Sequence, residues 1–143
     1  MGTYEFLEHT ADEKFVVTVP SLEDGFITAV TAFYEILLGK NISVNPLAKK
    51  TINLKAKKIE SLLYDFLNEL VFILDESDLL LPKVNKLRIE KNDKEEYELT
   101  AELMGDNRYN YSLLTEIKNM TYSEMNIKQK LEGDWELTVV VDI

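Results

Sequence analysis

The feature that most constrains the fold is an apolar stripe within residues 59–76, which read IESLLYDFLNELVFILDE. Apolar residues recur there at spacings of three and four, which places them on one face of a helix. They are Ile59, Leu62, Leu63, Phe66, Leu67, Leu70, Ile73 and Leu74. The stripe is broad enough to pack on a sheet, so the sequence predicts a helix over 59–76 with a sheet as its second layer.

A second helix is predicted over residues 21–38, which read SLEDGFITAVTAFYEILL. Ser21 with Asp24 three residues later predicts a capping pair at its start. Gly39 follows the last apolar position, as a glycine after a helix does. The apolar residues at helical spacing are Leu22, Phe26, Val30, Phe33 and Leu37.

Much of the remaining chain alternates apolar and polar residues with period two, which is typical of half-buried strands. The alternating apolar sets are Phe15, Val17 and Val19; Ile52, Leu54 and Ala56; Leu87 and Ile89; Tyr97, Leu99, Ala101 and Leu103; Ile127 and Leu131; and Trp135, Leu137, Val139 and Val141. The polar stretches 92–95 and 132–134 are predicted to turn two hairpins. Two long helices and about seven strands predict a single α+β domain over residues 1–143, with the helices packed on mostly antiparallel, hairpin-connected sheets.

The charge balance restricts the partners. The chain has 16 Lys and Arg against 26 Asp and Glu, a net charge of −10. Because such a surface repels phosphate, we expect the chain to meet RNA only through a partner, and basic proteins or divalent cations suit it better. The chain has no Cys, which excludes disulfides, zinc thiolates and a thiol nucleophile. No secretory signal or membrane-spanning stretch is visible, so we expect a cytoplasmic protein without a membrane association.

The motifs of common catalytic sites are absent. The sequence contains no P-loop, no GxGxxG and no GxSxG. Its one histidine, His9, excludes a two-His metal site, and a lone histidine is more often structural than catalytic. Carboxylates are therefore the main candidates for chemistry.

Two acids lie close together on the predicted helix over 59–76. Asp65 and Glu69 are four residues apart and share one face, with Asn68 beside them. A solvated helix face is the commoner reading of this spacing. The polar face is nevertheless narrow and acidic, as a site for an oxygen-liganded cation requires, so spacing alone leaves both readings open.

A third acid, Asp142, closes the alternating segment WELTVVVDI. The alternation places Asp142 on the face opposite to Leu137, Val139 and Val141. It is read either as a solvated end of the chain or as part of a cation site. We expect the carboxylate of Ile143 beside it, and two such charges either cost energy or hold a cation between them.

Four segments together resemble the archease family. They are YEFLEHTAD (4–12), LLYDFLNEL (62–70), EIKNMTY (116–122) and VVDI (140–143), and SLEDGFITAV resembles the first helix of the family. They follow in family order and spacing over nearly the whole chain. Archeases are small acidic α+β proteins that serve as cofactors of the RtcB-type tRNA-splicing ligase, which joins broken RNA ends with GTP and a divalent metal. They promote guanylylation and repeated turnover of the ligase and have no ligase chemistry of their own.

The resemblance assigns roles to individual residues. Asp12 matches the acid that closes the HTAD motif, and Asp142 matches the acid of the closing D-I/L. In the family these two carboxylates and the backbone oxygen of the last residue, here Ile143, bind a metal, usually described as calcium; Mg²⁺ and Mn²⁺ are alternatives. Lys118 matches a lysine that is implicated in activating the ligase.

Three further residues are expected to support this site. Asp65 and Glu69 match acids of the family's helix motif, and His9 is retained beside Asp12 as structural support. The chain departs from the family at Tyr109, which follows Arg108, and at Ser123, since family members often carry histidines at both positions.

Two other functions compete with the ligase cofactor. A chaperone-like adaptor for other RNA-modification enzymes would use the same acidic surface without metal or GTP. A stand-alone metal-dependent hydrolase is disfavoured, because the chain lacks a second His, a Cys and any nucleophile motif.

Overall fold

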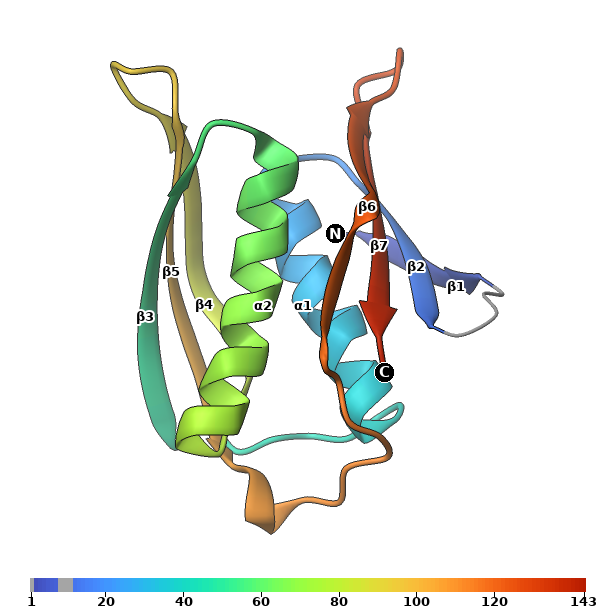
Figure 1. Cartoon of the computed structure of the whole chain (residues 1–143), viewed down its shortest axis with the longest axis vertical. Helices are drawn as coiled ribbons and strands as arrows, with labels where there is room; N and C mark the ends of the chain where they lie inside the picture. Colours follow the sequence, from blue (N-terminus) through green and yellow to red (C-terminus); the bar gives the residue numbers. More distant parts are fainter. Residues whose placement is uncertain (1, 8–11) are drawn as a thin grey trace.

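The structure is a computed structural model that describes residues 2–7 and 12–143. Seven strands and two α-helices occur within these residues (Figure 1). In chain order they are β1 (Thr3–Leu7), β2 (Glu13–Val19), α1 (Leu22–Leu38), β3 (Ala48–Ala56), α2 (Ile59–Ser77), β4 (Leu79–Lys91), β5 (Tyr97–Asn107), the 3₁₀ turn η1 (Arg108–Asn110), β6 (Asn119–Gln129) and β7 (Trp135–Asp142).

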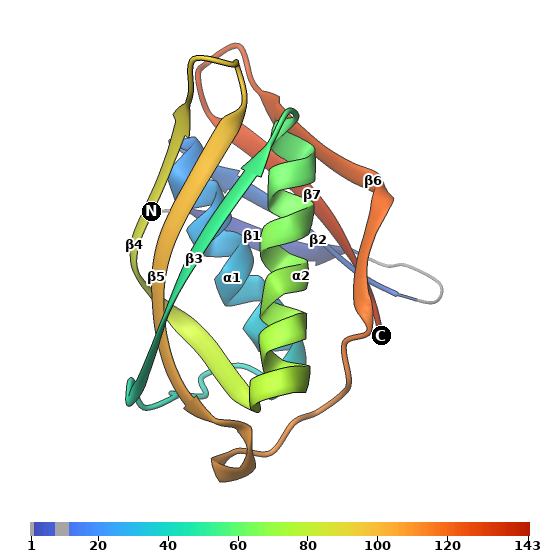
Figure 2. The same cartoon turned by 60° about the vertical axis from the view of Figure 1, so that its left-hand side comes forward.

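The chain forms three layers, with both helices between two sheets (Figures 1 and 2). Sheet A has the strand order β1-β2-β7-β6, and sheet B has the order β3-β5-β4. Every pairing in the two sheets is antiparallel. The α+β class and the antiparallel sheets expected from the sequence are therefore confirmed.

The two helices begin and end close to their predicted limits. The Ser21 Oγ accepts a hydrogen bond from the Asp24 N–H at 3.1 Å, which caps α1. Helix α1 ends at Leu38, because Gly39 takes a φ of 92° that glycine tolerates well. Helix α2 extends to Ser77, one residue beyond the predicted end. Phe26 of α1 and Phe66 of α2 are fully buried and stack with their ring centroids 6.0 Å apart, so the apolar stripes meet in one core.

Two sequence predictions of strands need correction. Strand β1 was not expected, because it is only five residues long and most of its residues are exposed, although Tyr4 and Phe6 alternate with polar neighbours. Leu131 was read as part of a strand, but β6 ends at Gln129 and Leu131 is fully exposed in the turn that follows. Both hairpins form as predicted, and Asn92 closes the first by accepting hydrogen bonds from the backbone N–H groups of Lys94 and Glu96.

Asp106 is a buried acid at the end of β5. Its Oδ1 accepts a hydrogen bond from the Asn107 N–H at 2.8 Å, and its Oδ2 accepts from the Tyr111 hydroxyl at 2.9 Å and from Asn110 Nδ2 at 3.2 Å. The same Tyr111 hydroxyl accepts from the Asn45 N–H, so the cluster joins η1 to the connection between α1 and β3. These hydrogen bonds, chiefly that from Asn107 N–H, hold the pKa of Asp106 below its usual value.

Replacing Asp106 with asparagine is expected to lower the melting temperature at pH 7. A lowered folded-state pKa stabilises the fold above the ordinary Asp pKa of about 3.9, and this stabilisation is lost as the pH falls through the folded value. The melting temperatures of wild type and Asp106→Asn should therefore converge in strong acid. Thermal unfolding followed by circular dichroism at several pH values checks this, with the exposed Asp93→Asn as control. A gap that stays the same at every pH would contradict the account.

Candidate functional site

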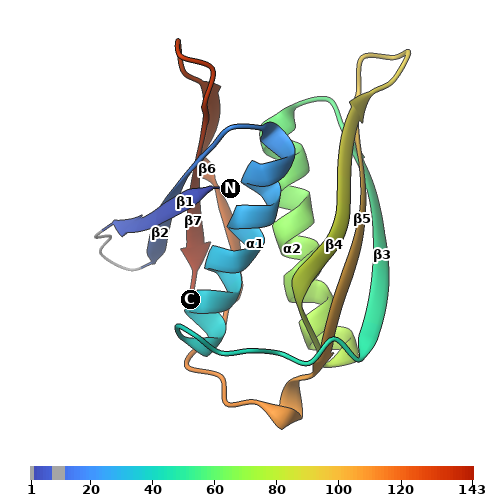
Figure 3. The ribbon, with the colours of Figure 1, turned by 180° about the vertical axis from the view of Figure 1, so that it is seen from behind.

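Three strand ends meet at one end of sheet A. Strand β7 lies between β2 and β6 and is antiparallel to both, so the end of β7 adjoins the starts of its two neighbours. Glu13 pairs with Val141 and Asn119 pairs with Asp142. Asp12 comes one residue before Glu13, so continuing the same antiparallel register brings it next to Asp142. This end of the sheet lies where the C-terminus is marked (Figures 1 and 3).

Lys118 is fixed beside Asp142 by its backbone. The Lys118 N–H donates a hydrogen bond to the Asp142 carbonyl oxygen at 2.8 Å, and the preceding Ile117 is buried. The Lys118 side chain is exposed and makes no ion pair within the described part of the chain. The structure thus brings Asp12, Lys118, Asp142 and Ile143 to one end of sheet A.

The alternation predicted for β7 is observed, with one exception. Leu137, Val139 and Val141 are buried in the core, whereas Asp142 is partly exposed on the other face. Val140 shares the face of Asp142 but is also fully buried. In register it lies between Lys14 of β2 and Thr121 of β6.

An ion pair crosses β7 on this face. Lys14 Nζ lies 3.4 Å from Glu124 Oε1, which joins the strands on either side of Val140. Glu124 can reach across because β6 bulges between Thr121 and Asn126. The outer face next to Asp142 is therefore braced by a charge pair that sequence spacing could not reveal.

Helix α2 is attached to the start of β6 by Asn68. Its Oδ1 accepts a hydrogen bond from the Met120 N–H at 2.9 Å, and Met120 is buried. Tyr122 adds an edge-to-face contact with Tyr64, with ring centroids 5.3 Å apart. Figure 2 shows α2 running alongside β6. Asn68 is thus a structural residue that holds the Lys118 segment in place.

Replacing Asn68 with alanine is expected to destabilise the fold by about 1–3 kcal/mol, because the buried Met120 N–H loses its acceptor. The segment 116–120 should also exchange its amide hydrogens faster, since the start of β6 loses its link to α2. Urea unfolding and amide hydrogen exchange measure the two effects. Ser61→Ala, which removes the exposed contact of Ser61 with the Tyr122 hydroxyl, serves as the control and should cost much less.

Asp65 and Glu69 lie on the same helix, on its outward side. Asp65 is exposed and Glu69 is half-buried, and neither forms a hydrogen bond or ion pair within the described residues. Desolvation by neighbouring atoms still raises the pKa of Asp65 above its usual value. The structure places both acids on the element that packs against β6, and their part in a shared acidic site stays a prediction.

The donor set at the strand ends suits a hard cation. Carboxylates of Asp12 and Asp142 and the backbone oxygen of Ile143 are the ligands that Ca²⁺ prefers, and six to eight oxygens complete its shell. Over residues 2–7 and 12–143, no group of three or more His, Asp or Glu side chains is placed to hold a metal. A cation here would therefore take main-chain oxygens and water as well. His9 lies outside the described residues.

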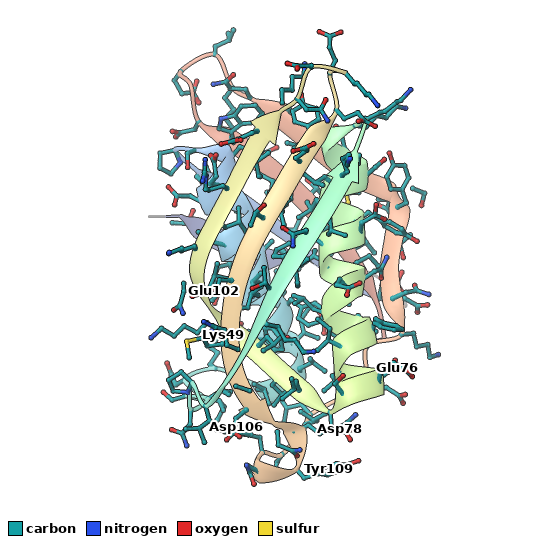
Figure 4. The ribbon with its side chains drawn as sticks, turned by 90° about the vertical axis from the view of Figure 1, so that its left-hand side faces the viewer. Lys49, Glu76, Asp78, Glu102, Asp106 and Tyr109 are labelled. Carbon is teal, nitrogen blue, oxygen red and sulfur yellow. The ribbon has the colours of Figure 1, made fainter. Side chains whose placement is uncertain are left out.

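The two departures from the family pattern lie apart from this donor set. Tyr109 is 77% exposed in η1, with the Arg108 guanidinium 5.7 Å from its ring centroid (Figure 4). Ser123 is exposed in the bulge of β6. Neither side chain belongs to the oxygen donors at the strand ends.

A surface pocket of about 480 Å³ lies at the end of α1. Tyr4 and Glu35 line it, and the Tyr4 hydroxyl donates a hydrogen bond to Glu35 Oε1 at 2.5 Å. This bond, with some desolvation, raises the pKa of Tyr4 to about 12. None of the site residues predicted from the sequence lines the pocket.

The comparisons with known proteins all indicate the same family. The profile of the archease protein family (MTH1598/TM1083) matches residues 4–143. Protein archease of Methanosarcina barkeri is 35% identical over 98% of this chain and 95% of its own length. Protein archease-like of Drosophila melanogaster is 33% identical over 98% of this chain and 90% of its own length.

A solved structure has the same fold. The solution structure of Methanobacterium thermoautotrophicum protein 1598 superimposes with a TM-score of 0.82 at 27% identity, covering 98% of each chain. Within the described residues, neither helix is long and apolar enough to cross a membrane. The full-length profile match and the relatives above 30% identity, which cover nearly the whole chain, show that this chain belongs to the archease family.

Proposed function

We propose that this protein is a cytoplasmic, non-catalytic cofactor of an RtcB-type RNA ligase. It promotes guanylylation of the ligase with GTP and supports repeated turnover in tRNA splicing and RNA repair. The observation that supports this proposal is the family match over residues 4–143. The sequence contains no P-loop, GxGxxG or GxSxG motif that would favour a competing activity.

The strand ends of sheet A are the proposed working site. Asp12, Asp142 and the backbone oxygen of Ile143 would hold a divalent cation, with Ca²⁺ favoured by the all-oxygen ligands and Mg²⁺ or Mn²⁺ as alternatives. The cation would supply charge that brings carboxylates together without repulsion. Lys118, held next to Asp142 by its backbone hydrogen bond, would present its ammonium group to a phosphate or an acidic group of the ligase.

Charge complementarity would guide the encounter. The chain carries a net charge of −10, and a ligase that binds RNA and GTP needs a basic active site. An acidic protein approaching that surface is steered by the opposite charge, and the association should weaken as salt is added.

The test is guanylylation of the cognate ligase with GTP, with and without substoichiometric amounts of this protein. Multiple-turnover stimulation that requires a divalent cation supports the proposal. Binding to the ligase without stimulation would contradict it and would favour the adaptor function. Release of phosphate or nucleotide by this protein alone would instead indicate a hydrolase.

A further inference from the structure

The charges are segregated between the layers of this acidic protein. Helices α1 and α2 carry eight Asp and Glu residues and no Lys or Arg. The three strands of sheet B carry seven Lys and Arg residues against four acids. Sheet B is therefore a basic layer in a chain whose net charge is −10. Such a separation creates a local positive field that the net charge conceals.

The outer face of sheet B presents these cations in rows set by the strand register. One row joins Lys49 and Lys83 across Met104, and the next contains Lys86 and Glu102. Arg88 follows in the third row. We call Lys49, Lys83, Lys86 and Arg88 the basic patch; all four side chains are exposed. Figure 4 views this face and shows Lys49 and Glu102 on it.

Two acids on this face are already engaged with cations of the patch. Arg88 Nη2 donates a hydrogen bond to Glu90 Oε1 at 2.5 Å. Glu102 accepts a hydrogen bond from Asn85 Nδ2 at 3.2 Å through Oε1, and its Oε2 lies 3.9 Å from Lys49 Nζ. Lys83 and Lys86 form no ion pair within the described part of the chain. Their ammonium groups therefore remain available for an external anion.

Neutral hydrogen-bonding groups lie beside these cations. Thr51 and Asn53 of β3 and Thr100 of β5 share the outer face. The Thr100 hydroxyl donates to Asn53 Oδ1 at 3.2 Å, a bond that does not use the two amide hydrogens of Asn53. The face thus offers both charge and hydrogen bonds to phosphate oxygens.

We propose that the basic patch contacts the phosphate backbone of the RNA that the ligase holds; this inference rests on the proposed function. Cations two residues apart on a strand are about 7 Å apart, which is comparable with the spacing of successive phosphates. Protein partners are usually anchored by aromatic or large apolar side chains at the centre of the interface. The patch itself consists of cations, and the large apolar side chains beside it are Met104 and, at its edge, the exposed Leu47. A polyanion therefore fits the patch better than a protein surface does.

The free protein should bind RNA weakly through this patch. The acidic helices lie on the inner side of sheet B, whereas the RNA would bind its outer face. In 0.1 M salt the Debye length is about 10 Å, so the repulsion between the helices and the RNA is largely screened. A nuclear magnetic resonance titration with single-stranded RNA should therefore shift amides around Lys83, Lys86 and Thr100. The double variant Lys83→Gln/Lys86→Gln should lose these shifts. Absence of shifts in the wild type, or shifts confined to other elements, would overturn the inference.

The ligation reaction gives the functional readout. With the ligase present, Lys83→Gln/Lys86→Gln should raise the KM for broken RNA several-fold and leave guanylylation without RNA unchanged. The slope of log KM against log salt should fall by about 1 for each lost phosphate contact. Lys128→Gln/Lys130→Gln, which removes the same charge from the β6–β7 hairpin, should not change the KM.

The outcomes separate this inference from the proposed function. If the wild-type protein does not stimulate guanylylation of the ligase, the cofactor role is refuted. The RNA contact is still tested in that case, because the titration with RNA does not involve the ligase. An unchanged KM in the patch variant, or an equal change in the control, would refute the RNA contact. Weaker binding of the patch variant to RNA-free ligase would assign the patch to an acidic protein segment instead.

Discussion

Replacing Gly105 with alanine is expected to be among the most destabilising single changes in this protein. A Cβ at this position would lie 1.6 Å from the Leu80 carbonyl oxygen and 3.0 Å from the Leu81 Cα. These are backbone atoms of β4, and both leucine side chains are fully buried, so neither can move aside without displacing the core. We expect a loss of more than about 4 kcal/mol in the free energy of unfolding.

Urea unfolding of Gly105→Ala measures this loss, and Gly133→Ala provides the matched control. Gly133 has a φ of 103° in the β6–β7 hairpin, but a Cβ there would meet no atom within 4 Å. Its replacement should therefore cost only about 1 kcal/mol, from backbone strain alone. Similar losses in the two variants would mean that β4 does not approach β5 as closely as the structure places it.

Gly105 also illustrates what the sequence could and could not predict of the fold. The helices followed from periodicity, because their apolar stripes and the Ser21 and Gly39 signals act within a few residues. The bulge of β4 against β5 between Leu80 and Lys83, close to Gly105, depends on two strands far apart in the chain. Strand β1 was missed for a related reason, since an edge strand with exposed side chains is held by backbone hydrogen bonds to β2 and leaves little pattern.

The candidate site divides in the same way. The outward position of Asp142 followed from alternation along one strand. Its placement beside the start of β2 was suggested only by the family resemblance, because spacing cannot pair the two ends of a chain. The hydrogen bond from Met120 to Asn68 and the Lys14–Glu124 ion pair were not predicted, since both join different elements. The role of Asn68 had one sequence signal, a polar residue bordering the apolar stripe of a helix.

Replacing Asp142 with asparagine is expected to weaken calcium binding by at least about tenfold and to abolish stimulation of the ligase. The change removes the charge of a proposed ligand but keeps the size of the side chain. The contact that Asp142 makes with Lys118 uses its backbone carbonyl, which asparagine retains. Since the side chain is partly exposed, the stability of the metal-free protein should change by no more than about 0.5 kcal/mol.

Isothermal titration with Ca²⁺, thermal unfolding without metal, and ligase guanylylation measure these three effects. Glu136→Gln is the control, because Glu136 lies on the same face of β7 but pairs with Lys128 and Lys130; it should leave calcium binding intact. Full calcium affinity in Asp142→Asn would contradict the assignment.

Whether Asp12 and Asp142 hold one cation can be decided by combining Asp142→Asn with Asp12→Asn. If both carboxylates ligate the same ion, either single change already destroys the site, and the double variant should lose little further affinity. If each carboxylate bound a separate ion, or attracted calcium only through the general negative charge, the two losses would add. Strong non-additivity in calcium binding, with additive and small changes in metal-free stability, is therefore the result that a shared site at the strand ends requires.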